Sequence, residues 1–325
     1  MLEPAIKQGW LRALMFIPIW FLCTMVLGMI GGGIVFSIAV ASGAVIWGDQ
    51  ASIEEWAMSV ENDFTSPATL ILTTASIVGS FAAIWFMMTV INKEPLTNIG
   101  LSIKDRGKDM LVGLGVALLF IGGIFLILWA LGAITVTGVV EFKPAVFLVG
   151  LTLFIAAFNE EIVFRGYVLN NLMDSMNRWW ALGISSFLFA LLHLGNPGIL
   201  SNWVPLTELF AAGFILGISY TFTKNLWFPT FFHVGWNFFQ GLLGFEISGI
   251  DIDSWKIIDH KIALTEKLDE NGDVIFRSEG VPEMVNKFPD LISGGVFGIE
   301  GSVISLTLTI LGTYAIYRYY IHGQQ

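Results

Sequence analysis

Three charged side chains, Glu160, Glu161 and Arg165, lie inside a stretch of the chain that is otherwise apolar. Residues 147–158 precede them and are almost wholly apolar, and apolar residues resume after Gly166. Moving a charge to the centre of a bilayer costs about 3 kcal/mol or more, so charged residues at such positions usually mark a function. A carboxylate held there could act as a general base toward water.

The spacing within this group separates its two carboxylates. Glu161 and Arg165 are four residues apart, which is the geometry of an intrahelical ion pair, and pairing would lower the cost of burying both charges. Glu160 has only Val163 and Phe164 at the equivalent positions, and it points roughly 100° away from Glu161 around a helix. We therefore expect Glu160 to be free to act on another group, as a general base that activates water.

Two later apolar segments each contain one histidine, His193 and His233. If the chain reverses near residues 177–178, Glu160 and His193 lie roughly 24 and 21 Å from the turn at a rise of about 1.5 Å per residue. The hairpin therefore places Glu160 and His193 at nearly the same depth. His233 lies nearer the start of its segment, so its expected depth matches Glu160 less well.

His233 and Asn237 are four residues apart and share one helical face. A neutral imidazole and a carboxamide can both donate hydrogen bonds to an oxyanion. Phe189 precedes His193 by the same spacing, and we expect its ring to form a wall of the pocket.

These motifs, in this order, resemble those of the CAAX protease and bacteriocin-processing (CPBP, or Abi) family, which includes the Ras-converting CAAX endopeptidases. The resemblance covers about residues 150–245, and the glycine-rich run before the last apolar segment looks like that of bacterial members. It is carried by Glu160-Glu161-x-x-x-Arg165, Phe189-x-x-x-His193, His233-x-x-x-Asn237, Gly294-Gly295 and Gly298-x-Glu300-Gly301.

The resemblance implies an intramembrane endopeptidase that hydrolyses peptide bonds of membrane-associated or lipidated peptides and proteins. The motifs leave the substrate open among lipidated proteins, bacteriocin leaders and signalling peptides. The implied roles are activation of the attacking water by Glu160 with His193, stabilisation of the tetrahedral oxyanion by His233 with Asn237, and orientation of the site by Glu161 with Arg165.

Zinc is the alternative to a metal-free site. Glu160, His193 and His233 could bind zinc, since carboxylate and imidazole are common zinc ligands. The sequence contains no His-Glu-x-x-His motif, and a carboxylate with a histidine can activate water without a metal. We therefore expect no cofactor.

Two other classes of function remain open. One is a non-catalytic membrane immunity or scaffold protein. The other is a proton-coupled transporter, which could use buried Glu, Arg and His side chains as a relay. Transporters commonly contain related halves, and no clear internal repeat is visible in this sequence. Glu208, near a predicted helix start, and His260, in a predicted loop, are assigned no function.

The composition predicts the elements that position these residues. The chain is 55% hydrophobic and 13% charged, against about 25% charged in a typical soluble domain. Long apolar runs predict an all-α, polytopic transmembrane bundle rather than a β-barrel. We expect one integral membrane domain over residues 1–325, with its catalytic core at about 147–245. The apolar segments number about eight: 13–47, 67–91, 110–134, 147–170, 179–195, 206–222, 226–245 and 301–320.

The first apolar segment is too long for one perpendicular span, so we expect Gly31-Gly32-Gly33 to kink or interrupt it. It also exceeds the 7–15 residues of a signal-peptide core, which favours a retained helix. A soluble, acidic external loop is expected at about 246–300. Within it, residues 269–273 have the composition of a hairpin turn.

Charge asymmetry predicts the orientation. Lysine and arginine gather in the N-terminus, the 92–109 loop and near the C-terminus, whereas the 48–66 loop is acidic and has neither. The positive-inside rule then places both termini in the cytoplasm. The resemblance to bacterial family members implies the plasma membrane of a prokaryote. The net charge of −10, without a basic cluster, argues against nucleic acid as a partner and leaves membrane lipids and a peptide or lipidated protein substrate.

Overall fold

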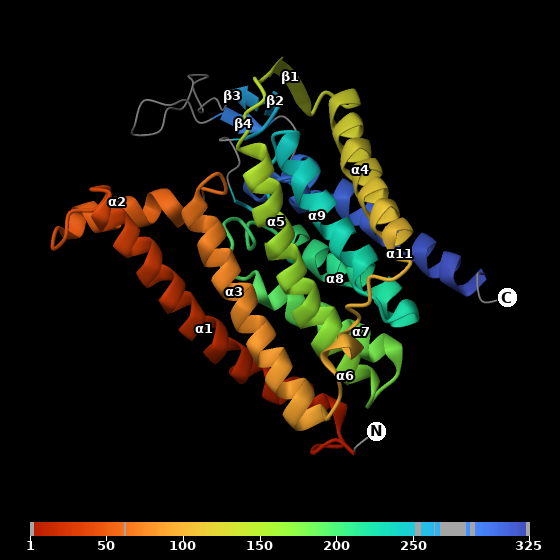
Figure 1. Ribbon diagram of the computed structural model, residues 1–325. Coiled ribbons are helices and arrows are strands. Elements are labelled where there is room, and N and C mark those ends of the chain that lie inside the picture. Colours follow the sequence, from red (N-terminus) through yellow and green to blue (C-terminus); the bar gives the residue numbers. More distant parts are fainter. Residues whose placement is uncertain are drawn as a thin grey trace.

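A computed structural model describes residues 3–61, 63–250, 255–262, 264–266, 284–286 and 290–322 as a bundle of packed helices (Figure 1). A helix forms in each predicted apolar segment, which confirms the all-α prediction. The helices are α1 (Gly9–Ala41), α2 (Gln50–Glu61), α3 (Pro67–Phe86), α4 (Gly107–Ala130), α5 (Val146–Glu161), α6 (Asn170–Met173), α7 (Arg178–Leu192), α8 (Val204–Thr223), α9 (Trp227–Leu242), α10 (Asp290–Ser293) and α11 (Val303–His322).

Two π-helices continue α-helices, and short 3₁₀ helices occur in the connecting segments. The π-helix η1 (Met87–Asn92) extends α3, and the π-helix η3 (Ile162–Leu169) joins α5 to α6 without a break. Short 3₁₀ turns are η2 (Leu96–Ile99), η4 (Gly295–Phe297) and η5 (Ile299–Gly301). The candidate charged residues therefore lie on one helical rod that runs from 146 to 173.

Five helical segments in the described part of the chain are long and apolar enough to cross a membrane: 9–41, 67–92, 107–130, 146–173 and 204–223. The other three predicted segments form α7, α9 and α11. Helix α7 has 15 residues and α9 has 16, fewer than the roughly 20 needed to span a bilayer. A 15-residue helix rises about 22 Å, which is less than the roughly 30 Å thickness of the hydrocarbon core. If α7 starts at one surface of the bilayer, it therefore ends within the hydrocarbon core.

Of the kink or interruption expected in the first segment, the interruption is wrong. Helix α1 is continuous through Gly31–Gly33 and ends at Ala41. Gly31 packs against α3, where an added Cβ would lie only 2.8 Å from the Cβ of Ala75. This glycine thus permits a close helix contact, as small residues do in membrane bundles. The segment after the turn forms α2, where we had expected a loop.

Small residues also bring α4 and α9 together. A Cβ on Gly113 would lie 2.8 Å from the carbonyl oxygen of Phe228, and one on Gly235 would lie 2.9 Å from the Cβ of Ala117. Helix α9, which bears His233, is held between α4 and α5 in the interior of the bundle (Figure 1).

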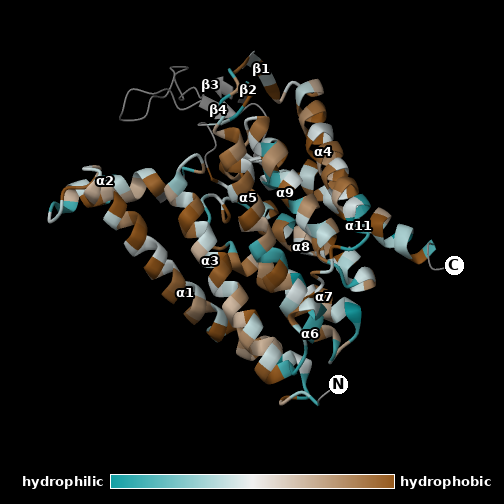
Figure 2. Ribbon diagram, in the orientation of Figure 1, coloured by the Kyte–Doolittle hydropathy of each residue, from teal (hydrophilic) through white to brown (hydrophobic). Residues whose placement is uncertain are grey.

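Apolar residues cover the outside of the bundle as well as its core. Figure 2 shows hydrophobic residues along α1, α3 and α4, with hydrophilic residues concentrated toward the ends of the helices. Met29, Leu119 and Phe147 are among the large apolar side chains that are exposed. Such a surface is suited to lipid rather than water.

Two small antiparallel ribbons lie at one end of the bundle (Figure 1). Strand β1 (Ile134–Val139) pairs with β2 (Ile258–Ile262), and β3 (Leu264–Glu266) pairs with β4 (Met284–Asn286). The hairpin turn expected at 269–273 lies outside the described residues.

The segment expected as a soluble loop is partly packed into the bundle. Trp255 is buried against Val146 and Val149 of α5. His260 is half-buried, with its ring 4.4 Å from that of Phe245, and burial lowers its pKa. The ends of the 246–300 segment therefore form part of the folded structure.

Candidate active site

The two glutamates lie in the last turn of α5, immediately before the π-helix η3. Every residue of η3 is buried. Single π-helical turns are rare and often occur at functional sites, where the extra residue per turn redirects side chains. The apolar sequence before Glu160 builds the helix, and the change of helical form follows directly after Glu161.

Glu161 is fully buried and forms the predicted ion pair. Its Oε1 accepts a hydrogen bond from Nη1 of Arg165 at 3.0 Å and lies 2.9 Å from Nδ1 of His233. Arg165, 1% exposed, also donates from Nη2 to the carbonyl oxygen of Gly213 in α8 at 3.2 Å. Its guanidinium lies over the ring of Phe189 in α7, 4.5 Å from the centroid. The pair thus connects α5 and η3 to α7, α8 and α9.

The side chain of Glu160 is partly exposed, whereas that of Glu161 is buried. The Glu160 side chain is 27% exposed, and its Oε2 lies 4.0 Å from Nε2 of His193 and 3.9 Å from Nε2 of His233. Both distances exceed those of direct hydrogen bonds, which are about 2.7–3.2 Å. They suit a water molecule that bonds to all three groups at once. The fold therefore brings Glu160, His193 and His233 together around one point.

The orientation of His193 is fixed by the backbone of α7. His193 is the residue that caps this helix, and its Nδ1 lies 2.9 Å from the carbonyl oxygen of Phe189. A carbonyl oxygen only accepts hydrogen bonds, so Nδ1 carries the proton and Nε2 of the neutral ring is the acceptor that faces Glu160. The ring of Phe189 lies against His193, with centroids 4.8 Å apart. Phe189 thus orients His193 through its carbonyl, a role that the sequence did not indicate, besides lining the pocket.

His233 is oriented by a carboxylate. Because Oε1 of Glu161 already accepts from Arg165, it is the acceptor for His233 as well, and Nδ1 of His233 donates. This bond directs the opposite nitrogen, Nε2, toward Glu160. The sequence paired Glu161 with Arg165 alone and gave no signal for its contact with a helix 72 residues away.

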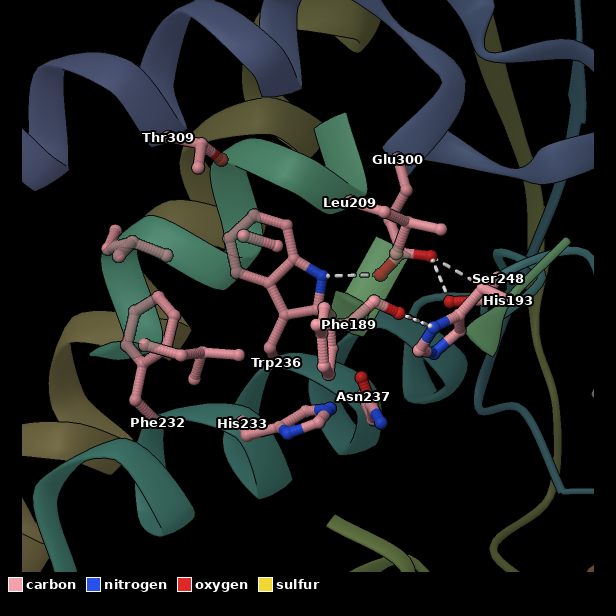
Figure 3. A pocket seen from close by; sticks show the side chains of 13 residues that line it. Phe189, His193, Leu209, Phe232, His233, Trp236, Asn237, Ser248, Glu300 and Thr309 are labelled. Carbon is pink, nitrogen blue, oxygen red and sulfur yellow. Dashed lines mark hydrogen bonds between the residues drawn. The ribbon is translucent and has the colours of Figure 1, made fainter. Parts of the chain in front are cut away.

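Asn237 lies one turn after His233 and shares a small cavity with both histidines (Figure 3). The cavity volume is ≈ 30 Å³, room for about two water molecules at 10–15 Å³ each. Apolar side chains of α7, α8 and α9 form about half of its wall. Its polar lining consists of His193, His233, Asn237, Ser248, Glu300 and Thr309.

Glu300 is a lining residue that the sequence analysis did not assign. It is 6% exposed and contacts Trp236 and Ser248 (Figure 3). The sequence feature that could have indicated Glu300 is that it is the single carboxylate in the glycine-rich run 294–301.

Glu208 is also placed differently from the expectation. It lies beyond the first turn of α8, is 1% exposed, and its Oε1 accepts from Ser305 at 2.9 Å and Thr309 at 2.7 Å, both in α11. It therefore joins two helices. The i,i+4 spacing of Ser305 and Thr309 on one helical face was the signal in the sequence.

The Glu160 carboxylate lies further from each of the two imidazoles than a zinc site requires. Among the described residues, no three His, Cys, Asp or Glu side chains are grouped closely enough to hold a metal ion. Ligands at about 2.0–2.2 Å from tetrahedral zinc lie roughly 3.4 Å from one another. Glu160 Oε2 lies 3.9 and 4.0 Å from the two imidazole nitrogens, so zinc would need the Glu160 carboxylate and the imidazoles to come closer together.

Comparison with known proteins gives one family match. Residues 142–239 match the family described as type II CAAX prenyl endopeptidase Rce1-like. No curated protein shows significant similarity to the chain. The matched range runs from just before α5 into α9 and contains every residue of the predicted site. The family resemblance inferred from the motifs is thus confirmed, and it is carried by residues 142–239 of the chain, which are similar to type II CAAX prenyl endopeptidases.

Proposed function

We propose that this protein is an intramembrane endopeptidase that hydrolyses peptide bonds of membrane-associated or lipidated substrates with water activated by Glu160 and His193. The observation that carries the proposal is the approach of one carboxylate oxygen to two imidazole nitrogens, at 3.9 and 4.0 Å, within the matched core of an endopeptidase family.

In the proposed first step, a water molecule bonds to Oε2 of Glu160 and to Nε2 of His193. The carboxylate takes one proton from the water while the oxygen attacks the carbonyl carbon of the substrate. The proton on Glu160 then passes to the leaving amine as the carbon–nitrogen bond breaks. His193 needs no proton of its own for this role, because its Nδ1–H bond to Phe189 leaves Nε2 as an acceptor.

The tetrahedral intermediate carries a negative oxygen, and His233 and Asn237 are proposed to stabilise it. With Nδ1 donating to Glu161, His233 can donate from Nε2 only as the imidazolium, which differs from the neutral ring considered from the sequence. The Glu161 carboxylate would compensate that positive charge. Asn237 would add its amide N–H from the next turn of the same helix.

An apolar groove supports the lipidated class of substrate. It has a volume of about 390 Å³ and is lined by α1, η3 and α7, including Phe164 and Leu192. Leu192 directly precedes His193, so an apolar chain in this groove would end close to the site. The proposal places the protein in a prokaryotic plasma membrane with both termini in the cytoplasm, working without a metal.

The test is a cleavage assay in nanodiscs with matched peptides that differ only in a prenyl group, read by mass spectrometry. We expect cleavage that survives chelation, prefers the lipidated peptide and is lost in His193→Ala. Asn237→Ala should lower kcat by about 10²–10³-fold, the usual effect of losing one oxyanion donor. His322→Ala, in the C-terminal helix far from the site in sequence, is the control and should match the wild type. Cleavage unchanged in His193→Ala would overturn the mechanism, and ion-driven uptake without cleavage would favour a transporter.

A further inference from the structure

Three loops meet beside the cavity, through hydrogen bonds that join Asn196 to Ser248, Ser248 to Glu300 and Gly249 to Phe297. They follow α7, follow α9 and precede α11, and Glu300 in the third loop contacts the structures that hold both histidines. We infer that Glu300 is a positioning residue that fixes the ends of α7 and α9, and thus His193 and His233, relative to each other. The inference rests on the proposed function.

The first contact reaches α9. Oε1 of Glu300 accepts a hydrogen bond from Nε1 of Trp236 at 3.0 Å (Figure 3). Trp236 lies between His233 and Asn237 in the sequence, on the turn that carries both. Its indole also packs against Phe232, with ring centroids 5.8 Å apart. The bond to Glu300 therefore fixes the rotation of α9 at the level of the site.

The second contact reaches the turn that contains His193. Oε2 of Glu300 accepts from the backbone N–H of Ser248 at 2.7 Å and from its hydroxyl at 2.8 Å. The carbonyl oxygen of Ser248 accepts from Nδ2 of Asn196 at 3.0 Å. The backbone N–H of Asn196 donates to the carbonyl oxygen of His193 at 2.9 Å. An unbroken series of hydrogen bonds thus leads from Glu300 to the residue that faces Glu160.

Glycines allow these loops to approach closely enough for the contacts. Gly249 has φ +83° and Gly298 has φ +79°, in the left-handed region that favours glycine. A Cβ on Gly249 would lie 2.2 Å from the carbonyl oxygen of Pro197, and one on Gly298 would lie 2.3 Å from that of Glu246. The Gly249 N–H also donates to the carbonyl oxygen of Phe297 at 3.2 Å. The glycine-rich run thus allows Glu300 to reach the site.

A carboxylate is suited to this position because it accepts all three hydrogen bonds at once. Removing it would leave the buried indole N–H of Trp236 and the part-buried backbone N–H of Ser248 without their acceptor, and such groups are costly to leave unpaired. Movement of α9 or of the 246–250 loop would let these N–H groups find other hydrogen-bond acceptors. Movement of about 1 Å at a catalytic group can lower a rate by about 100-fold.

Glu208 provides the matched control. It is a carboxylate buried to a similar degree, and it also accepts hydrogen bonds from hydroxyl groups. Its two hydrogen-bond donors, Ser305 and Thr309, both lie in α11, whereas those of Glu300 lie in α9 and in the loop after α9. Glu208→Ala should lower the thermal stability while kcat per folded molecule stays near the wild-type value.

The experiment compares Glu300→Ala, Glu300→Gln and Glu208→Ala in nanodiscs. We expect Glu300→Ala to lower kcat per folded molecule by about 10- to 100-fold with KM nearly constant. Glu300→Gln keeps one acceptor oxygen and should lie between the wild type and Glu300→Ala. Trp236→Phe should add nothing further to Glu300→Ala, because both remove the same bond.

Carbethoxylation of the histidines, mapped by mass spectrometry, gives a readout independent of cleavage. The rate at His193 and His233 should rise several-fold in Glu300→Ala and stay constant in Glu208→Ala. If Glu300→Ala does not fold, Trp236→Phe and Ser248→Ala must each show smaller changes in the same direction.

If the Glu300 variants have the same kcat and the same carbethoxylation rates as the wild type, the inference is overturned and the proposed function is left intact. Equal kcat losses in the Glu300→Ala and Glu208→Ala variants would also overturn it. Absence of wild-type cleavage would instead overturn the proposed function, and the carbethoxylation rates would still decide the positioning role.

Discussion

Two adjacent glutamates have different environments because a helix turns them to different sides. Glu161 is fully buried and contacts Arg165 and His233, whereas Glu160 is 27% exposed and faces two imidazole nitrogens. The sequence predicted this division from the i,i+4 spacing of Glu161 and Arg165. It did not predict the contacts of Glu161 with His233 or of Arg165 with Gly213, because these depend on how separate helices pack.

Removing the cation of the buried pair should destabilise the protein. We expect Arg165→Ala to lower the free energy of unfolding by about 3–5 kcal/mol, because the Glu161 carboxylate stays buried without its charged partner. Thermal unfolding in detergent measures the effect. Arg318→Ala, at an exposed residue of α11, should change the stability by less than about 0.5 kcal/mol. Equal stabilities of the two variants would show that the pair is not needed for the fold.

At the scale of elements, the sequence predicted where helices form better than how they touch. All eight apolar segments contain helices, since length and composition alone decide this. The continuity of α1 through its glycines and the contacts of the 294–301 loop were not predictable. Both depend on how segments that are distant in the sequence pack together. The π-helix η3 also had no signal in its apolar sequence.

Close packing of α7 against α8 should be necessary for the site. A Cβ on Gly213 would lie 2.6 Å from the Cβ of Ser186, and the carbonyl of Gly213 accepts from Arg165. We expect Gly213→Ala to destabilise the protein by about 1–3 kcal/mol through overpacking, and to reduce cleavage as the helices separate.

Gly122→Ala is the matched control in α4, where an added Cβ meets nothing within 4 Å. It should be neutral or stabilising by up to about 1 kcal/mol, because alanine favours a helix more than glycine does. Thermal unfolding of both variants, with cleavage assays, checks the pair. A Gly213→Ala protein as stable and active as Gly122→Ala would contradict this packing.

At the scale of the whole molecule, the family match covers residues 142–239, and the remaining helices surround that core (Figure 1). Helices α1 and α3 form a hairpin beside α5, and α4 packs on α9. The sequence predicted this outer group only as apolar segments. It could not predict that Glu300, outside the matched range, lines the same cavity as His193 and His233.

The Lys/Arg asymmetry predicts that the 48–66 loop is outside the cell and the 92–109 loop is inside. In a Cys23→Ser background, which removes the single native cysteine, Asp49→Cys should react with a membrane-impermeant maleimide on intact cells. Lys108→Cys should react only after the membrane is opened. Both positions are exposed in the structure, so a reversed pattern would show the opposite orientation.

The central claim is that Glu160 takes a proton from the attacking water, and the rate of peptide-bond hydrolysis by Glu160→Gln tests it most directly. Glutamine keeps the shape of the side chain but cannot accept that proton, so kcat should fall by about 10²–10⁴-fold, with the melting temperature unchanged. Glu141→Gln, at an exposed carboxylate outside the site, should cleave at the wild-type rate. A Glu160→Gln protein that cleaves as fast as Glu141→Gln would contradict the account.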